Sequence, residues 1–225
     1  MPPLSCRLAV AAVAVLAPLA GAASAQARIV EVGKAGGASA ATCPGSPCLA
    51  VSRATGYQRT VGAASSTYRV PAAGRLVAWT IALGSPNARQ VAFFDGAFGR
   101  ASAGITVLRP GKKKLQRFNV GQGPIVPLAP YFGQEAQFPL PTTLAVRPGD
   151  IVALSVPTWA PALTPLMNDG TSWLASRPKG RCDDTDTQRA HVKAGPTRYR
   201  CQYTARLTYS ATLVTAPQPT TVPAK

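Results

Sequence analysis

The sequence predicts an all-β protein, an antiparallel β-sandwich of jelly-roll-like form in a single domain. The strongest observation is residues 198–213, where polar and apolar side chains alternate at every position. A period of two is typical of a strand with one dry face and one wet face. In addition, 20 glycines and 22 prolines separate short alternating runs, and apolar periodicity of helix length is missing. These patterns favour two stacked sheets.

The first 27 residues have the layout of a secretory signal peptide. Arg7 precedes an apolar run from Leu8 to Gly21, and small residues with A-x-A spacing follow. The run is too short to cross a bilayer, which takes about 20 residues. We therefore expect an exported, extracellular protein without a membrane span. The sandwich domain would cover residues 28–215, and the Pro- and Thr-rich residues 216–225 would form a disordered tail.

Four cysteines remain after the predicted leader, namely Cys43, Cys48, Cys182 and Cys201. An even number in an exported chain indicates two disulfides, for which three pairings exist. We favour the local pairings, Cys43 with Cys48 and Cys182 with Cys201. The first closes a tight turn, and the second ties a polar loop to the alternating strand. A four-cysteine zinc site is disfavoured, because structural zinc ligands usually come in pairs two to four residues apart.

The first half of the domain is predicted to consist of short strands separated by Gly- and Ala-rich loops. In chain order these strands are 28–34, 49–61, 65–71, 76–83 and 91–94. The run 76–83 is the clearest, because Val77, Trp79 and Ile81 share one face while the other face is only weakly polar. It is therefore expected to be a central strand. Asp95 and Gly96 are interpreted as a turn that ends the run 91–94.

Two hairpins are predicted in the second half. Residues 105–109 and 115–120 flank a tip that holds Lys112, Lys113 and Lys114. Residues 142–156 form the other hairpin around Arg147–Asp150, where Pro148 and Gly149 suit a type II turn. A proline-punctuated loop at 157–167 then carries Trp159, and residues 171–177 are expected to form one more strand before the polar Cys182–Cys201 loop.

Several segments are similar to those of a known group of proteins. They are PYFGQEAQFPL, GDIVALSVPTWAPAL, TSWLASRP and YTARLTYSATL. They resemble uncharacterised secreted proteins of high-GC soil actinobacteria, and the likeness covers roughly residues 43–214. The resemblance implies an exported β-sandwich and implies no activity, ligand or catalytic residue.

The chain is strongly basic, with 24 Lys and Arg against 8 Asp and Glu and a formal net charge of +16. One cationic group surrounds the first predicted hairpin and comprises Arg109, Lys112, Lys113, Lys114 and Arg117. Such a field attracts anionic envelope polymers, acidic glycans or nucleic acid, and salt weakens it. The alternative is that these cations only protect exposed sheet edges and keep an exported protein soluble.

Three aromatic residues fall in or beside predicted loops: Tyr131, Trp159 and Trp173. Exposed rings at one end of a sandwich would stack on sugar rings and give a carbohydrate-binding module. Tryptophan is highly buried on average, so the alternative is that these rings close the ends of the sandwich. The test is whether the three rings line one exposed groove.

Acidic residues offer two candidate sites. A glycosidase needs two carboxylates across one bond, and Glu135 could serve as one of them. Asp183, Asp184 and Asp186 could bind Ca²⁺ through oxygen ligands, although the glycine and the later glutamate of an EF-hand loop are missing. The alternative for this trio is a solvated acidic loop near arginines. Asp95, Asp150 and Asp169 are all expected in turns.

Other catalytic motifs are missing from the sequence. His191 is the only histidine, and neither a G-x-S-x-G elbow nor an HEXXH motif accompanies it. We interpret His191 as an ordinary loop residue. The leading hypothesis is therefore an exported, non-catalytic binding module for glycan or an anionic cell-envelope polymer. The alternatives are a glycosidase-like hydrolase that uses Glu135 or the Asp183–Asp186 group, and a purely structural surface protein.

Overall fold

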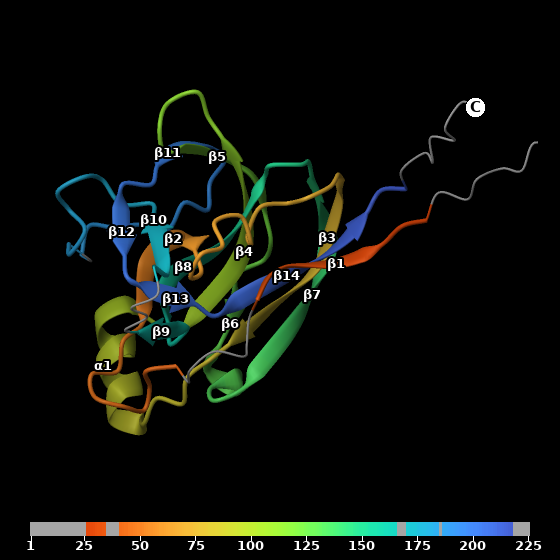
Figure 1. Cartoon of the computed structure of the whole chain (residues 1–225). Coiled ribbons are helices and arrows are strands. Elements are labelled where there is room, and N and C mark those ends of the chain that lie inside the picture. Colours follow the sequence, from red (N-terminus) through yellow and green to blue (C-terminus); the bar gives the residue numbers. More distant parts are fainter. Residues whose placement is uncertain (1–25, 35–40, 166–169, 185, 218–225) are drawn as a thin grey trace, which may run out of the picture.

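The computed structural model describes residues 26–34, 41–165, 170–184 and 186–217, so nearly all of the predicted leader and most of the predicted tail lie outside the described part. Two large antiparallel sheets form the two layers of the molecule (Figure 1). Sheet A has the order β1 (Ile29–Lys34), β14 (Tyr209–Thr215), β3 (Gly74–Ala82) and β7 (Glu135–Val146). This confirms the all-β sandwich, whereas the jelly-roll connectivity stays a prediction.

Sheet B is the larger layer, with eight strands. Its order is β11 (Gly195–Arg198), β5 (Gln116–Gln122), β4 (Ser102–Pro110), β8 (Ile151–Ala160), β2 (Val51–Thr60), β10 (Ser172–Ala175) and β12 (Cys201–Tyr203), with β6 (Val126–Pro127) paired to one end of β4. A further pair consists of β9 (Leu163–Pro165) and β13 (Ala205–Leu207). A short 3₁₀ helix, η1 (Ala129–Tyr131), precedes β7.

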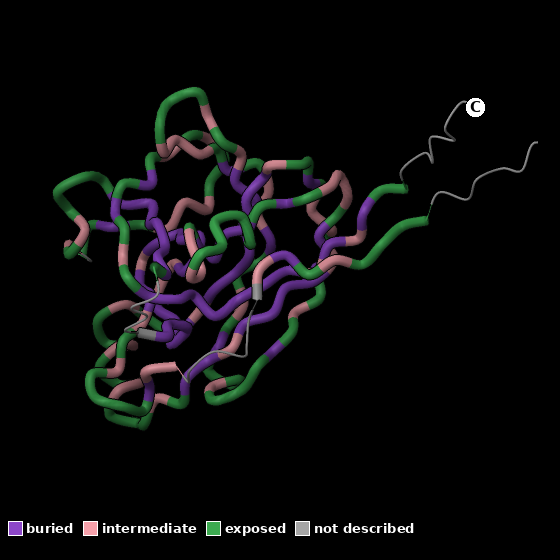
Figure 2. The backbone as a smooth tube through the Cα atoms, viewed as in Figure 1, coloured by how far each residue is buried: buried purple, intermediate pink, exposed green. Residues whose placement is uncertain are grey.

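The main core fills the space between the sheets. Sheet A contributes Trp79 and Tyr209, and sheet B contributes Ile105, Leu154 and Trp159, all of them buried. Figure 2 shows that the buried residues follow the strands, whereas most loops are exposed. The Tyr209 hydroxyl donates to the Val152 carbonyl at 2.9 Å, so the core also links the two sheets by a hydrogen bond.

A second apolar cluster lies on the outer face of sheet B. Successive strand residues point to opposite faces, so Val107 joins the main core while Leu108 joins this outer cluster. Its other buried members are Tyr57, Ile151, Ala153, Leu174 and Tyr199. Sheet B is therefore apolar on both faces, which positions the candidate site described below.

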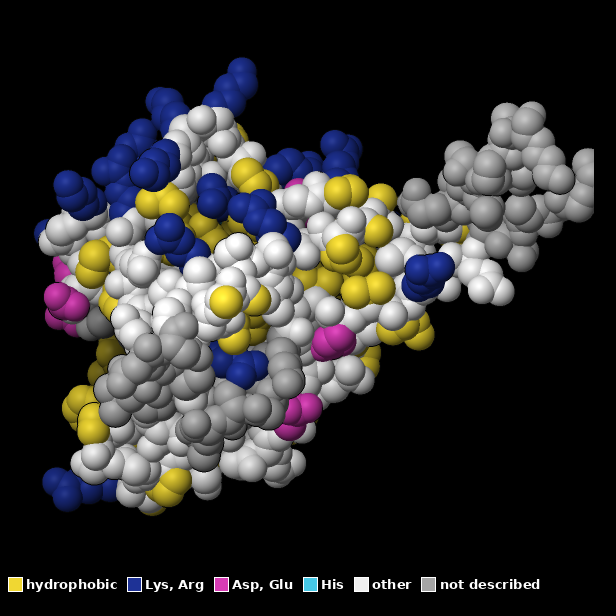
Figure 3. Space-filling model, in the orientation of Figure 1, with side chains coloured by type: hydrophobic (Ala, Val, Ile, Leu, Met, Phe, Trp, Pro, Cys, Tyr) yellow, Lys and Arg dark blue, Asp and Glu magenta, His cyan; other side chains and the backbone are white. Residues whose placement is uncertain are grey.

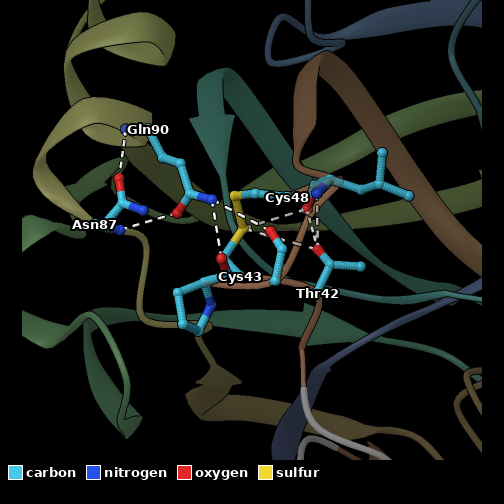
Figure 4. Close-up of a disulfide and its surroundings, with 8 residues drawn as sticks. Thr42, Cys43, Cys48, Asn87 and Gln90 are labelled. Atoms are coloured by element: carbon cyan, nitrogen blue, oxygen red, sulfur yellow. Dashed lines mark hydrogen bonds between the residues drawn. A yellow bond between two sulfur atoms is a disulfide. The ribbon is translucent and has the colours of Figure 1, made fainter.

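The predicted disulfides are confirmed. Cys43 is bonded to Cys48, and Cys182 to Cys201. Figure 4 shows the first bridge beside the amino end of helix α1 (Ala88–Phe98), where the Gln90 side chain donates to the carbonyls of Pro44 and Gly45 at 3.0 and 3.2 Å. The small disulfide loop is thus attached to the helix.

Helix α1 contradicts the prediction of a strand at residues 91–94 and of a turn at Asp95. Its amino end is a capping box, in which the Asn87 side chain accepts from the Gln90 amide and the Gln90 side chain accepts from the Asn87 amide. The Asp95–Gly96 pair does not interrupt the helix, which continues through it to Phe98. This helix is too short to span a bilayer, and no described helix is long and apolar enough to do so.

The two predicted hairpins have different outcomes. β4 and β5 pair as expected, with Arg109 opposite Phe118. Residues 142–156 do not form a hairpin, because β7 pairs with β3 in sheet A and β8 pairs with β2 and β4 in sheet B. The Arg147–Asp150 turn is present, with Gly149 at φ 85°. It carries the chain from sheet A to sheet B. Turn residues determine that the chain reverses direction, but they do not determine which strands pair with each other.

The predicted continuous strand 198–213 is divided into segments that lie in different places. β11 pairs with β5, β12 with β10, β13 with β9, and β14 with β1 and β3. The expected dry face is confirmed for Tyr199, Cys201, Leu207 and Leu213, which are buried. The expected wet face is wrong for Arg206, Thr208 and Ser210, which are buried as well. The chain passes here from the edge of sheet B into sheet A, where both faces of the segment are covered.

Candidate functional site

An arginine-lined cleft of about 370 Å³ opens on the outer face of sheet B. We call it the arginine cleft, and its cationic side chains are Arg59, Arg69 and Arg117. Leu174 and Tyr57 from the outer apolar cluster also line it. Figure 3 shows Lys and Arg side chains gathered over this part of the molecule, around exposed hydrophobic side chains.

Three segments distant in sequence bring these arginines together. Tyr57 and Arg59 lie two residues apart on β2, so they share its outer face. Arg117 comes from β5, on the far side of β4 and β8. Arg69 lies in the connection between β2 and β3, where an isolated bridge to Ile151 fixes its backbone beside β8. The strand order of sheet B thus creates the cationic cleft.

Several contacts fix the Arg117 guanidinium group in the arginine cleft. Its Cζ lies 5.3 Å from the centroid of the Tyr57 ring, and its Nη2 donates to the Tyr57 hydroxyl at 2.9 Å. Its Nη1 donates to the Gln116 carbonyl at 2.7 Å. The buried Nε has no hydrogen-bond partner among the described residues. A buried N–H of this kind is unusual in native proteins.

The electrostatic field in the arginine cleft is positive and uncompensated. Burial raises the pKa of the Tyr57 phenol, and the charges of Arg117, Arg69 and Arg59 oppose that rise. Among the described residues, no aspartate or glutamate lines the cleft. The two salt bridges found in the described part of the chain, Arg109–Asp150 and Arg181–Asp184, involve none of these three arginines. The cleft is therefore suited to an anionic group.

The structure places the predicted cationic hairpin next to this cleft. Arg117 belongs to both, while Lys112, Lys113 and Lys114 are exposed at the turn between β4 and β5. The sequence does not single out Arg59 and Arg69, because neither belongs to a group of cationic residues that are close together in the chain. Only the pairing of β2 with β8 and the bridge at Arg69 connect them to Arg117.

The three candidate aromatic residues do not line one groove. Trp159 is 0% exposed and lies in β8, where it stacks on Phe94 of α1 at 4.7 Å and donates from Nε1 to Asp95 at 2.7 Å. Trp173 is 4% exposed and stacks on Tyr203 at 4.6 Å. The hypothesis that Trp159 and Trp173 are exposed and stack on a sugar ligand is thus contradicted. Burial of these large rings stabilises the sandwich instead.

Tyr131 is the one candidate ring with substantial exposure. It is 37% exposed and meets Phe138 of β7 edge-on at 5.0 Å. A single ring in η1 packed against sheet A, without the two tryptophans, does not form the stacking surface that the sugar-binding hypothesis requires.

The carboxylates give the glycosidase alternative little support. Glu135 is exposed at the start of β7 and does not line the arginine cleft. Glu31 lies on β1, three strand spacings across sheet A, which is about 14 Å. Paired carboxylates of glycosidases lie within about 10 Å. Asp95 and Asp150 are hydrogen-bonded by Trp159 and Arg109, and Asp169 lies outside the described residues.

The acidic loop is not assembled as a calcium site. Within the described ranges no three His, Cys, Asp or Glu side chains gather closely enough to hold a metal ion. Asp184 instead accepts from the amides of Asp186 and Thr187 and from the Thr187 hydroxyl. These bonds, those to Thr187 above all, hold the pKa of Asp184 below its ordinary value. Asp183 and Asp186 are exposed, as in the solvated-loop alternative.

Comparisons with protein-family models, with curated proteins and with solved structures find no match to this chain. Function must be inferred from the site. The resemblance to secreted actinobacterial proteins stays a prediction, and the arginine cleft is the feature of the structure with the most defined chemistry.

His191 is a structural residue in the segment that covers the outer face of sheet B. Its amide donates to the Thr55 hydroxyl at 2.8 Å, and its carbonyl accepts from Asn119 at 2.9 Å. Its ring nitrogens contact the Tyr199 hydroxyl at 3.1 Å and the Gly195 carbonyl at 3.0 Å. Burial lowers the pKa of the imidazole, and the bond to Gly195 opposes this shift.

We expect the His191 environment to make stability depend on pH. The folded protein binds a proton at His191 less readily than the unfolded chain, whose histidine pKa is about 6.5. This contribution is present above pH 6.5 and is lost as the pH falls below it. Denaturant unfolding between pH 7.5 and 5 should show a decline that is smaller in His191→Gln. Equal declines in both proteins would contradict the assignment.

Proposed function

We propose that this protein is a non-catalytic, exported binding protein for an anionic cell-envelope polymer, and that the arginine cleft holds one acidic group of that polymer. The observation that carries the proposal is the convergence of three guanidinium groups on a cleft to which the described part of the chain contributes no carboxylate. Guanidinium groups form charge-assisted, bidentate hydrogen bonds to carboxylate and phosphate groups.

The rest of the surface supports a polymer as the ligand. Lys112, Lys113 and Lys114 extend the cationic field along the β4–β5 hairpin beside the cleft. The net charge of +16 adds long-range attraction for a polyanion. Two disulfides fit an oxidising, extracellular compartment. With Trp159 and Trp173 buried, recognition by charge is better supported than stacking on a neutral glycan.

The test is retention of the protein on insoluble cell wall and on immobilised acidic polysaccharide across a salt series. Arg59→Gln/Arg69→Gln changes two exposed cleft residues, and Arg89→Gln/Arg100→Gln removes the same charge from exposed positions elsewhere. We expect the cleft variant to bind about tenfold more weakly, which is about 1.4 kcal/mol. The control variant should change the affinity far less.

Two results would contradict this proposal. Equal weakening in both variants would show attraction to net charge alone, without a site. No retention at low ionic strength would remove polymer binding altogether. Competition with duplex DNA is the third arm, since tighter binding to DNA than to the envelope polymer would assign the cationic surface to nucleic acid instead.

A further inference from the structure

A second, larger groove lies at the end of the sandwich, where sheet A meets the edge of sheet B. Its volume is about 770 Å³, within the range of small-molecule sites. Four valines line it, one from each of four strands: Val77 of β3, Val120 of β5, Val146 of β7 and Val214 of β14. We call it the valine groove. Figure 3 shows hydrophobic side chains exposed over the region of β3 and β14.

Two β-bulges orient valines in this groove. In β3, Leu76 and Ala78 each have a paired residue on both neighbouring strands, β7 and β14. Val77 between them has a paired residue on neither strand. The pairing of β4 with β5 shifts between Asn119 and Gly121, which leaves Val120 unpaired and 41% exposed. Bulges change the direction of a side chain, and they are enriched beside functional sites.

Arginines lie around the same groove, and none of the described residues that line it is acidic. Arg109 is neutralised by Asp150, whose carboxylate accepts two hydrogen bonds from it at 2.8 Å. Arg75 donates to the Thr143 carbonyl at 2.8 Å. Arg147 is exposed and makes no ion pair within the described residues. Two uncompensated cations therefore border an apolar wall.

We propose that the valine groove binds a single alkyl chain that carries an acidic head group, with the chain against the four valines and the head group at Arg147 and Arg75. An apolar wall alone would fit many ligands, whereas the positive border selects an anionic amphiphile. This site shares no lining residue with the arginine cleft, so an experiment that contradicts one proposal does not contradict the other.

The test is titration calorimetry of the full chain with dodecanoate below its micelle concentration. Dodecanoate should bind at one site per chain. Decanoate should bind about tenfold more weakly, since each buried methylene changes affinity by up to about fourfold. Dodecyltrimethylammonium, which has an alkyl chain of similar length and the opposite charge, should not bind measurably. Equal binding of this cation or no saturable binding of dodecanoate would overturn the proposal.

Variants separate the two parts of the groove. Val120→Gln should weaken dodecanoate binding about tenfold through the alkyl chain, and Arg147→Gln about fivefold through the head group. Phe93→Gln and Arg89→Gln alter exposed residues of α1 outside the groove and should leave the affinity unchanged. Unchanged dodecanoate affinity in both groove variants would overturn the site. If one variant folds poorly, unchanged affinity in the other overturns it alone.

Two further measurements decide between this proposal and its competitors. Sedimentation of the free protein should show a monomer, whereas a dimer broken by Val120→Gln would assign the groove to a second copy of the chain. Arg59→Gln/Arg69→Gln should still bind dodecanoate normally. Loss of dodecanoate binding in that variant would place the ligand in the arginine cleft and contradict the valine groove.

Discussion

Replacing Trp159 with alanine is expected to lower the free energy of unfolding by about 3–5 kcal/mol. The indole is fully buried between α1 and the sandwich, with Phe94 at 4.7 Å and Phe132 at 5.5 Å from its ring. Truncation leaves a large cavity and also removes the donor to Asp95. Chemical denaturation, monitored by far-ultraviolet circular dichroism, measures the change.

Two further variants show how much of this loss comes from the N–H group and how much from burial of the ring. Trp159→Phe keeps an aromatic ring and removes only the N–H, so it should lose less stability than Trp159→Ala. Tyr131→Ala truncates a ring that is 37% exposed and should change stability by less than about 1 kcal/mol. If Trp159→Ala instead unfolded like the parent protein and lost binding to polysaccharide, the ring would be a ligand platform and the buried placement would be wrong.

Trp159 also shows why sequence reasoning failed at the ends of the sandwich. Pro157 and Pro161 favoured a loop around it, yet β8 continues through Pro157 to Ala160. Helix α1, whose Phe94 covers the indole, was missed because Asp95 and Gly96 resemble a turn. The spacing from Asn87 to Gln90 was the available signal, since it forms the capping box. Without the helix, the partner of Trp159 could not be foreseen.

The alternating C-terminal stretch shows what a period of two does and does not determine. It correctly identified apolar positions that are buried, for example Tyr199 and Leu207, but it wrongly predicted exposure for Arg206, Thr208 and Ser210. It could not show that the stretch changes sheets, because alternation describes the two faces of a strand and carries no information about its neighbours. The Arg147–Asp150 turn has the same limit, and β7 and β8 accordingly lie in different sheets.

The candidate site was only partly predictable for a related reason. Arg117 and the lysines beside it are close in sequence, so their shared charge was visible. Arg59 and Arg69 join Arg117 only through the strand order β5–β4–β8–β2. Likewise, the valine groove depends on bulges at Val77, where β3 pairs with strands distant in sequence, and at Val120, inside the β4–β5 hairpin. Both sites are products of tertiary structure, and local motifs do not encode them.

Replacing Asp150 with alanine is expected to destabilise the protein by about 3 kcal/mol, near the lower end of the range for breaking a buried ion pair. Its side chain is 2% exposed and accepts two bonds from Arg109 at 2.8 Å and one from the Arg147 amide at 2.9 Å. Arg109 is 36% exposed, so its released charge can reach water, which moderates the loss. Denaturant unfolding at pH 7 measures it.

A double-mutant cycle with Arg109→Gln tests the origin of that loss. If the ion pair connects the β7–β8 turn to β4, the two substitutions together should destabilise the protein by clearly less than the sum of their separate effects. Glu31→Gln neutralises an exposed acid on β1 and should change stability by less than about 0.5 kcal/mol. Additive effects of Asp150→Ala and Arg109→Gln would contradict a coupled pair. They would instead assign the role of Asp150 to its bond with the Arg147 amide, which closes the turn between the two sheets.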